Sequence, residues 1–304
     1  MEILGVSGSL LRGNQQPQSP VLADIRGAAA DSFKRQIPSH LYHADREIVS
    51  CSMLKPMLKS PAHYIAALTA LHDTEAMQIG TVYHALVLEP QTIHSVVALY
   101  PGPLDRSKDA QAFKAANRDR ICLPLTTFLT MQDVAARVRE SEFRGRPFYR
   151  YIEEGEVEAS LYFTDPTTGV RCRSRMDLWH PDYTFDLKTT STCGPQAFQK
   201  HGLDLDYDLQ GFMYSYARAL FDGTSKAKPF VFVAAETSEP HSVFYMPAND
   251  SFINNGCAKY KSALSSLKAC TLSDHWPAPF GEYDMDLLPW QTYSPSTTTW
   301  NHSV

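Results

Sequence analysis

Residues 173–188, RSRMDLWHPDYTFDLK, place two aspartates on the neighbouring strands of an expected β-hairpin. If the turn is centred on Pro181 and Asp182, antiparallel pairing sets Asp177 opposite Asp186. Directly opposed residues have Cβ atoms about 4.5–5.5 Å apart, and like charges at that distance destabilise a sheet. A positive group is therefore expected between the two carboxylates.

A divalent cation would meet that need, because Mg²⁺ is commonly held by one or two carboxylates and several waters. Lys188 lies two residues after Asp186 and so points to the same face of the strand; the same register sets Arg175 opposite Lys188. This arrangement favours phosphodiester hydrolysis. The metal would polarise the phosphate and activate a water, while the lysine orients that water or stabilises developing charge.

A solvent-exposed hairpin is the alternative, with Arg175 and Lys188 as salt-bridge partners of the aspartates, since a D-x-K pattern is short. Two observations favour the metal. Phe185 and Leu187 alternate with the polar residues, which indicates that the opposite side of the strand is buried. Further polar residues of suitable type also occur elsewhere in the chain.

The composition is that of a globular protein: 304 residues, 43% hydrophobic and 20% charged, with a formal net charge of −5. This balance argues against non-specific coating of nucleic acid but does not exclude a nuclease, because active-site carboxylates add negative charge.

The apolar stretches at 65–71 and 230–235 are far shorter than the roughly 20 residues of a membrane span. No secretory signal pattern begins the sequence, so we expect a cytoplasmic protein of a bacterial host cell, without membrane association. The six cysteines show no CxxC pair, which argues against structural zinc.

The hydrophobic period changes from helical to strand-like after Gly155. Residues 1–40 are expected to be an extension of uncertain order, 41–285 the main domain, and 286–304 a flexible tail. Helices are expected over 51–59 with Ser50 as cap, from Pro61 with Ser60 as cap, over 76–89, within 107–142, and over 205–220 and 249–270. Strands are expected over 157–163, 170–179 and 183–189 as an antiparallel meander, and over 229–235 and 242–246 as a hairpin.

Three motifs resemble the PD-(D/E)XK nuclease superfamily. Asp177 followed by Asp186-Leu187-Lys188 resembles its core, His84 in GTVYHALVLEP resembles the histidine motif of its RecB-type branch, and QGFMY at 210–214 is similar to that branch's QxxxY motif. Within the branch, VSCSMLKPMLKSPAHYIAAL at 49–68 and Trp276-Pro277 are similar to the exonuclease domain of the exodeoxyribonuclease VIII (RecE) family. The resemblance spans about residues 42–277.

The resemblance implies an α/β fold of the PD-(D/E)XK type, in which a central mixed sheet, flanked by helices, carries the active site on an antiparallel meander. It implies a metal-dependent 5′ to 3′ exonuclease on linear double-stranded DNA, encoded by a phage or prophage. The product would be a 3′ single-stranded overhang for homologous recombination through a single-strand annealing protein. A homo-oligomeric ring around the DNA is expected. Mg²⁺ is the expected cofactor, with Mn²⁺ able to substitute because imidazole suits Mn²⁺ better.

Carried over by resemblance, the metal ligands are His84, Asp177, Asp186 and the backbone carbonyl of Leu187. Lys188 would be the catalytic lysine, acting with the two aspartates. Gln210 and Tyr214, four apart on a helix and so on one face, would support the site or contact DNA.

Glu158 is a candidate for a second metal ion or for the attacking water. The turn at 165–169 leaves its register open by one residue, and a slip of one residue reverses the face. Arg171, Arg173 and Arg175 alternate along one strand and share a face, which suits either phosphate contacts or a solvated basic strand.

Two other functions stay open: a structure-specific or single-strand nuclease of RecB type, and a non-catalytic DNA-end-binding module. The three charges at 177, 186 and 188 argue against the second. The chain has no GxxxxGK[ST] and no HExxH motif. We expect Tyr207, Phe212 and Tyr216 to be core residues and not platforms for stacked bases.

Overall fold

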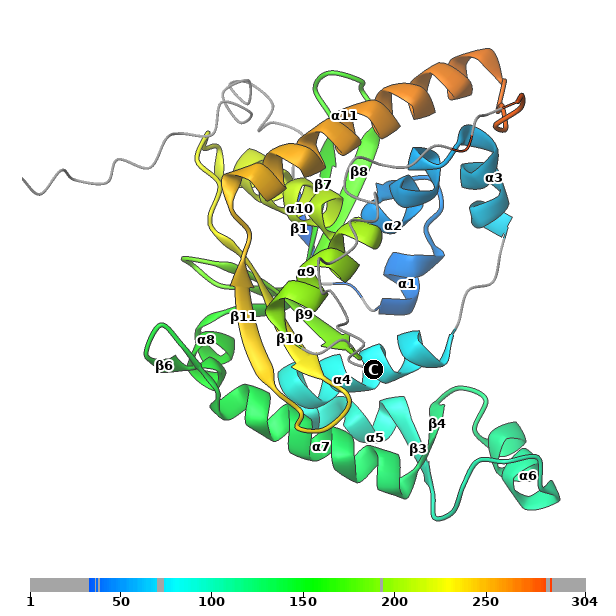
Figure 1. Cartoon of the computed structure of the whole chain (residues 1–304), viewed down its shortest axis with the longest axis vertical. Helices are drawn as coiled ribbons and strands as arrows, with labels where there is room; N and C mark the ends of the chain where they lie inside the picture. Colours follow the sequence, from blue (N-terminus) through cyan, green and yellow to red (C-terminus); the bar gives the residue numbers. More distant parts are fainter. Residues whose placement is uncertain are drawn as a thin grey trace, which may run out of the picture.

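A mixed seven-stranded sheet forms the centre of the protein (Figure 1). The computed structural model describes residues 33–35, 37, 39–69, 74–191, 194–282 and 285. The strand order is β1-β7-β8-β9-β10-β11, with β2 beside β8. Neighbours pair antiparallel except β9 with β10 and β2 with β8. The strands are β1 (Phe33–Arg35), β2 (Val49–Ser50), β7 (Glu156–Thr164), β8 (Arg171–Trp179), β9 (Thr184–Thr190), β10 (Phe230–Glu236) and β11 (Val243–Pro247).

Helices cover both faces of this sheet, which confirms the expected α/β architecture. The α-helices are α1 (Ser39–Ala44), α2 (Cys51–Leu54), α3 (Pro61–Thr69), α4 (Glu75–Leu88), α5 (Ile93–Val96), α6 (Lys108–Ala116), α7 (Leu125–Glu140), α8 (Phe148–Glu154), α9 (Pro195–Asp204), α10 (Tyr207–Asp222) and α11 (Asp250–Ser273). Two 3-10 helices, η3 (Lys55–Leu58) and η4 (Pro90–Thr92), and two small sheets, β3 (Val97–Tyr100) with β4 (Ile121–Pro124) and β5 (Glu142–Phe143) with β6 (Arg146–Pro147), complete the described elements.

The expected meander and the expected hairpin are both present, as β7-β8-β9 and β10-β11. Ser60 caps α3 by accepting a hydrogen bond from the backbone of His63, whereas Ser50 makes no side-chain cap and bonds to Ser52 instead. The helix α9 was not expected.

Residues 33–35, expected to belong to the extension, form β1 against β7. Residues 1–32 and the expected tail 286–304 lie outside the described residues. The sheet therefore begins earlier in the chain than the hydrophobic pattern indicates.

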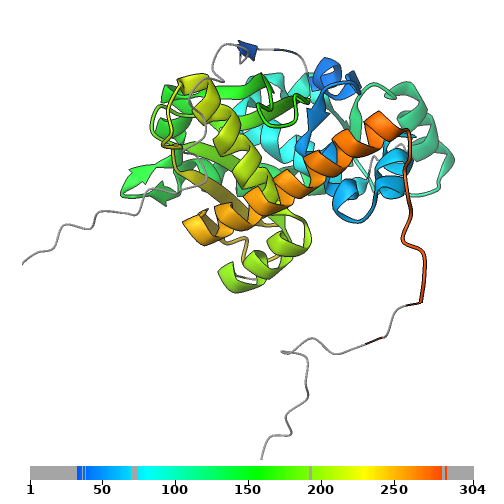
Figure 2. The ribbon, with the colours of Figure 1, turned by 90° about the horizontal axis from the view of Figure 1, so that it is seen from above.

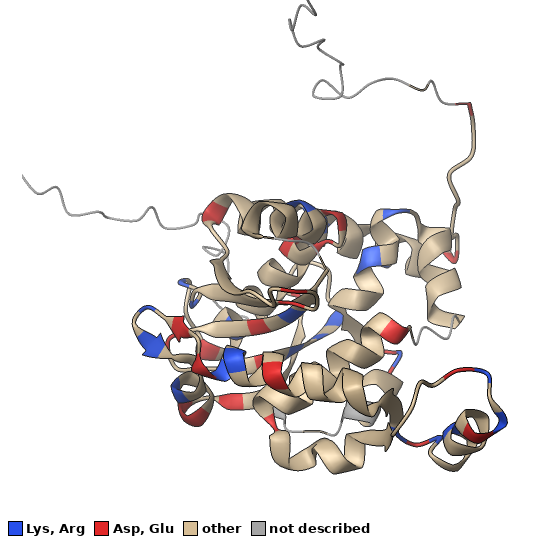
Figure 3. Cartoon of the chain, turned by 60° about the horizontal axis from the view of Figure 1, so that its bottom comes forward, with Lys and Arg blue, Asp and Glu red and all other residues tan. Residues whose placement is uncertain are grey.

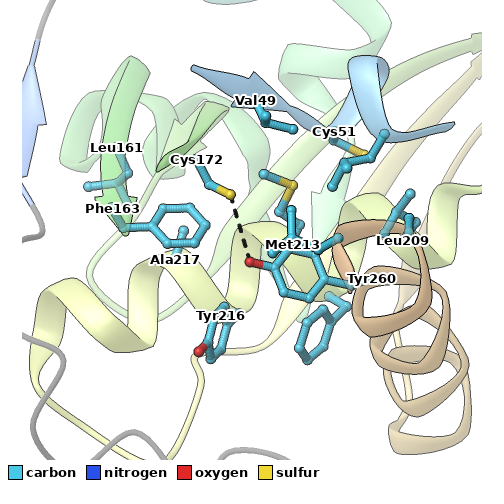
Figure 4. Packing of buried hydrophobic residues seen from close by; sticks show 14 of the residues in the cluster. Val49, Cys51, Leu161, Phe163, Cys172, Leu209, Met213, Tyr216, Ala217 and Tyr260 are labelled. Carbon is cyan, nitrogen blue, oxygen red and sulfur yellow. Dashed lines mark hydrogen bonds between the residues drawn. The ribbon is translucent and has the colours of Figure 1, made fainter. Parts of the chain in front are cut away.

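One core cluster lies between the sheet and the crossed helices α10 and α11 (Figure 2). Met213 of α10 and Tyr260 of α11 belong to this cluster together with Leu161 and Phe163 of β7 (Figure 4). Phe212 and Tyr216 belong to this cluster, as expected. These contacts fix α10 firmly on the sheet.

A second cluster joins α4, α7 and α8 to the opposite face. Phe185 and Leu187 of β9 are fully buried in it, which confirms that this side of the strand is apolar. Asp186 and Lys188 therefore point to the α10 face.

The segment with β3, α6 and β4 extends away from the central sheet (Figure 1). Lys or Arg and Asp or Glu positions are interspersed along it (Figure 3). Among the described residues no helix has both the length and the apolar composition that a membrane crossing requires.

Candidate active site

The strands β8 and β9 pair only next to their turn. Leu178 pairs with Phe185 and Trp179 with Thr184, which confirms the expected register. One step further, at Asp177 and Asp186, the backbone ladder stops, because β8 continues beside β2 instead. The two strands thus form a fork, with the two aspartates at its base.

The side chain of Asp177 replaces the missing ladder bond. Its Oδ2 accepts a hydrogen bond of 2.7 Å from the backbone N–H of Leu187. This leaves Oδ1 of Asp177 directed at His84, whose Nδ1 lies 3.6 Å away. The carboxylate therefore holds the fork together and still offers an oxygen to a ligand.

Asp186 is 1% exposed. Its Oδ1 accepts a hydrogen bond of 2.7 Å from Nε2 of Gln210, and its Oδ2 contacts the ammonium group of Lys188. Oδ2 is buried, and the ion pair with Lys188 is its contact among the described residues. A buried carboxylate oxygen in this state has spare capacity for a cation.

His84 reaches the site from α4, which begins at a side-chain cap from Thr74. Its Nε2 donates to the carbonyl of Leu187 at 3.0 Å. In the neutral imidazole this bond places the proton on Nε2, which leaves the lone pair of Nδ1 facing Asp177. The ring of His84 thus lies between the Leu187 carbonyl and Asp177.

Glu158 faces the site, which resolves the question of its register. It lies opposite Asp177 in the pairing of β7 with β8, between the pairs Val157–Leu178 and Ala159–Met176. Its φ is +55°, a rare value for a residue other than glycine. The left-handed backbone turns the strand here: Ala159 packs in the α10 cluster, whereas Val157 packs in the α4 cluster.

Ligand-type atoms of His84, Glu158 and Asp177 all lie within 4.8 Å of one another. Burial, together with the nearby charge of Asp186, raises the pKa of Asp177 to about 7, although His84 opposes this. Burial lowers the pKa of Lys188, but the charges of Asp186 and Asp177 outweigh it and raise this pKa overall. The site thus concentrates negative charge that a bound cation would stabilise.

These residues fit a divalent cation. The donors that lie within 4.8 Å of one another are carboxylate oxygens of Glu158 and Asp177 and the imidazole of His84. The Leu187 carbonyl contacts the same imidazole, and Asp186, which is not part of that group, is ion-paired with Lys188. Oxygen-rich donor sets with one imidazole suit Mg²⁺ or Mn²⁺ better than soft metals.

Gln210 and Tyr214 project from α10 on one face, one turn apart. Gln210 reaches Asp186, while the ring of Tyr214 packs against Phe230 with centroids 6.2 Å apart. Burial raises the pKa of Tyr214 far above its usual range, so its phenol stays protonated. Gln210 therefore orients an acid of the site, and Tyr214 supports the helix beneath it.

The expectation that three arginines share a solvent-facing side is wrong for Arg173. Arg173 is 2% exposed; its guanidinium lies 4.4 Å from the Tyr42 ring centroid and donates to the carbonyl of Asp45. Arg175 forms an ion pair with Glu158 and donates to the carbonyl of Ile37. The reason is that Ile37, Tyr42 and Asp45 contact this part of β8, which no local pattern revealed.

Arg171 alone of the three is exposed, so only this arginine keeps the expected freedom to contact phosphate. Arg175 instead positions Glu158.

The sequence patterns did not assign Tyr207 and Lys55 to the site, although both lie beside it. Tyr207, expected in the core, is half-buried, and its ring centroid lies 5.0 Å from the ammonium of Lys188 and 5.4 Å from that of Lys55. Lys55 also donates to the carbonyl of Leu205. The three-residue spacing from Tyr207 to Gln210 on one helix could have indicated the first residue, whereas no sequence signal pointed to Lys55.

The resemblance at Trp276-Pro277 corresponds to a packed segment. The Trp276 ring stacks on Tyr64 of α3 with centroids 5.7 Å apart, and the carbonyl of Pro277 accepts a hydrogen bond from Ala62. This segment therefore holds α3 in place and lies outside the acidic cluster.

Comparisons with known proteins agree with this geometry. Residues 50–286 match the family described as PDDEXK-like domain of unknown function (DUF3799). A solved structure from Eubacterium rectale, named as a candidate exonuclease, is similar with a TM-score of 0.57 and 15% identity, over 80% of this chain and 90% of that chain. Another, named SSO0001, has a TM-score of 0.28 and 10% identity over 72% of this chain and 85% of its own, too low to support an argument. No curated protein matches the sequence.

Proposed function

The chain belongs to the PDDEXK-like domain family, within the PD-(D/E)XK nuclease superfamily, and on that premise we propose that it is a metal-dependent 5′ to 3′ exonuclease on double-stranded DNA. One observation carries the proposal: His84, Glu158 and Asp177 converge within 4.8 Å at the fork where Asp186 and Lys188 lie. Electrostatic stabilisation of a phosphoryl transition state requires such a group of acids, metal and lysine.

His84, Asp177, Asp186 and the Leu187 carbonyl would hold the cation, with Glu158 at its edge. A divalent ion there supplies positive charge at the phosphate and lowers the pKa of an attacking water. We infer Mg²⁺ as the usual ion, with Mn²⁺ substituting, because the donors are mostly oxygens with one imidazole.

The protein's own residues perform the positioning. Lys188 directs its ammonium at the water or at a phosphate oxygen during in-line attack. Gln210 fixes Oδ1 of Asp186, so that Oδ2 stays directed toward the cation and Lys188. The Leu187 carbonyl fixes the ring of His84. Each interaction removes a rotational freedom before substrate arrives, which is how positioned groups accelerate reactions.

We extend this proposal to a biological role on the basis of the resemblance to the exodeoxyribonuclease VIII family. The protein would resect linear DNA to 3′ single-stranded overhangs and pass them to a single-strand annealing protein in phage-encoded recombination inside the host cytoplasm. A homo-oligomeric ring would keep it on the duplex. Arg171 is the exposed strand residue that we assign to phosphate contact.

The decisive test is digestion of blunt linear duplex labelled at either the 5′ or the 3′ end, with Mg²⁺, with Mn²⁺ and with chelator. We expect early release of the 5′ label with either metal and none with chelator. Asp186→Asn should abolish release. Asp182→Asn should not, since this aspartate lies exposed in the turn of the same hairpin and provides a matched control.

Other outcomes would redirect the proposal. Early release of the 3′ label would reverse the polarity. Cleavage of single strands or flaps with blunt duplex untouched would favour a RecB-type nuclease. Binding of DNA ends without cleavage by either metal would favour a DNA-end-binding module.

A further inference from the structure

A cavity of about 310 Å³ lies beside the candidate active site and is lined by residues of α9, α10, β10, β11 and α11. Figure 1 labels these elements. Four aromatic residues line it: Phe198, Tyr207, Phe232 and Phe252. Its volume falls near the lower end of the roughly 300–1,000 Å³ typical of small-molecule pockets. The catalytic proposal makes no use of this cavity.

The cavity is joined to the site through two of its walls. Phe232 of β10 is the direct parallel partner of Asp186, so its ring stands next to that carboxylate on the same face of the sheet. Tyr207 stacks on Phe232 with centroids 5.5 Å apart and planes at 25°. The same Tyr207 ring lies within about 5 Å of the ammonium groups of Lys55 and Lys188. Tyr207 therefore belongs both to the cavity wall and to the surroundings of the two ammonium groups.

The rings are held in place before any ligand binds. Phe198 and Phe232 are almost fully buried, and Phe198 packs edge-on against Phe244 at 5.6 Å between centroids. Exposed amides at the rim, from Gln199 of α9 and Asn255 of α11, add hydrogen-bonding groups. Rigid aromatic walls with a few polar groups at the rim are typical of a pocket for a planar, partly polar ligand.

We propose that this cavity binds the nucleobase of the nucleotide whose phosphate lies at the metal site, an inference that rests on the proposed nuclease function. A nucleotide combines the two required features: a phosphate for Lys55 and Lys188, and a flat ring for the aromatic walls. Stacking on aromatic side chains tolerates any base, because every base has a π-face. The cavity would hold an unpaired terminal base while its phosphodiester bond is cut.

If the cavity holds the base, removal of the base should make the reaction less efficient. Base–aromatic stacking is worth about 1–3 kcal/mol per base, which corresponds to about 5- to 150-fold in affinity. We compare linear duplexes whose 5′-terminal nucleotide carries a base or is abasic, and measure kcat/KM for release of that nucleotide. Wild type should release the abasic nucleotide about 5- to 150-fold less efficiently.

Ser251→Trp tests the location, because Ser251 is exposed at the rim and an indole there would fill the chamber without removing a core residue. Ser251→Trp should release the normal and the abasic nucleotide with the same kcat/KM. Ser265→Trp, on the exposed side of the same helix, should keep it. The pair Gln199→Leu and Gln196→Leu repeats the comparison on α9, since Gln199 lines the cavity and Gln196 does not.

Three results are separable. If wild type releases both nucleotides equally, the base pocket is overturned and the nuclease stands. If Ser251→Trp and Ser265→Trp discriminate equally, the pocket lies elsewhere and the proposal fails. If no DNA is cut, the nuclease proposal fails, and equilibrium dialysis of dAMP against deoxyribose 5-phosphate decides the pocket: tighter binding of dAMP supports it, and equal binding rejects it.

Discussion

Buried charged side chains are partnered differently at the two ends of the β8–β9 pair. At the turn, Arg218 of α10 is 2% exposed and donates hydrogen bonds to the carbonyls of His180, Pro181 and Tyr183 and to Oγ1 of Thr184. At the fork, Asp177 and Asp186 are also buried, yet Oδ2 of Asp186 lacks a hydrogen-bond partner among the described residues.

This difference separates structure from function within one pair of strands. A buried guanidinium whose two terminal nitrogens donate to four oxygens, with its Nε 3.5 Å from Asp222, fixes a turn. Buried acids left short of positive charge instead destabilise the metal-free protein and provide a place for a cation. The four predictions below test that contrast, from the largest expected effect to the smallest.

Arg218→Ala should have the largest effect, lowering the free energy of unfolding by about 3–5 kcal/mol, because it leaves several buried oxygens without donors. Urea unfolding followed by circular dichroism measures this. Arg118→Ala, at an exposed position, should leave the midpoint unchanged. A small effect at Arg218 would mean that the turn is held by the surrounding aromatic rings alone.

Lys188→Met should lower kcat about 10²- to 10³-fold, the usual cost of losing one group that stabilises transition-state charge. Single-turnover digestion of labelled duplex at saturating metal measures it. Lys226→Met, exposed after α10, is the control and should retain full activity. Retained activity in Lys188→Met would assign the catalytic cation elsewhere, with Lys55 the first alternative.

Arg175→Met should weaken metal binding about 10- to 100-fold, since Arg175 holds Glu158 toward the site and residues that orient ligands commonly contribute this much. Calorimetric titration with Mn²⁺ in the absence of DNA measures it. Arg171→Met, four positions earlier on the same strand but exposed, should bind metal normally. Equal affinities would show that Glu158 is not a ligand.

Counted per pH unit, the smallest effect is a dependence of stability on pH. Because the pKa of Asp177 is raised from 3.8 to about 7, the folded metal-free protein binds this proton more tightly than the unfolded chain does. The contribution of Asp177 to the free energy of unfolding should therefore be greatest below about pH 4. It should fall as the pH rises to about 7, by at most ~1.4 kcal/mol per pH unit.

Urea midpoints of chelator-treated protein across that pH range test the sign. Asp177→Asn removes the titrating group while its amide oxygen can still accept from Leu187, so the slope should flatten. If stability changes equally with pH in wild type and in Asp177→Asn, the titrating group is not Asp177.

Much of the fold follows from local pattern. Alternation of apolar and polar residues defined the strands β7, β8 and β9, and the turn at Pro181 and Asp182 defined the register. Position along that register then placed Asp186 and Lys188 on one face. Helix α9 was missed, and Ser50 was assigned a cap that its side chain does not make.

The sequence by itself determined the meander, the side of the strand on which Asp186 and Lys188 stand, and the spacing of Gln210 and Tyr214 on one helix face, since each depends on neighbours within a few residues. Only the tertiary structure decided the fork, the left-handed turn that aims Glu158 at Asp177, the burial of Arg173 against Tyr42 and Asp45, and the meeting of Tyr207 with Lys55 and Lys188. Those features join segments far apart in the chain, and contacts between such segments are set by packing and by the need to partner buried charge, which no local period encodes.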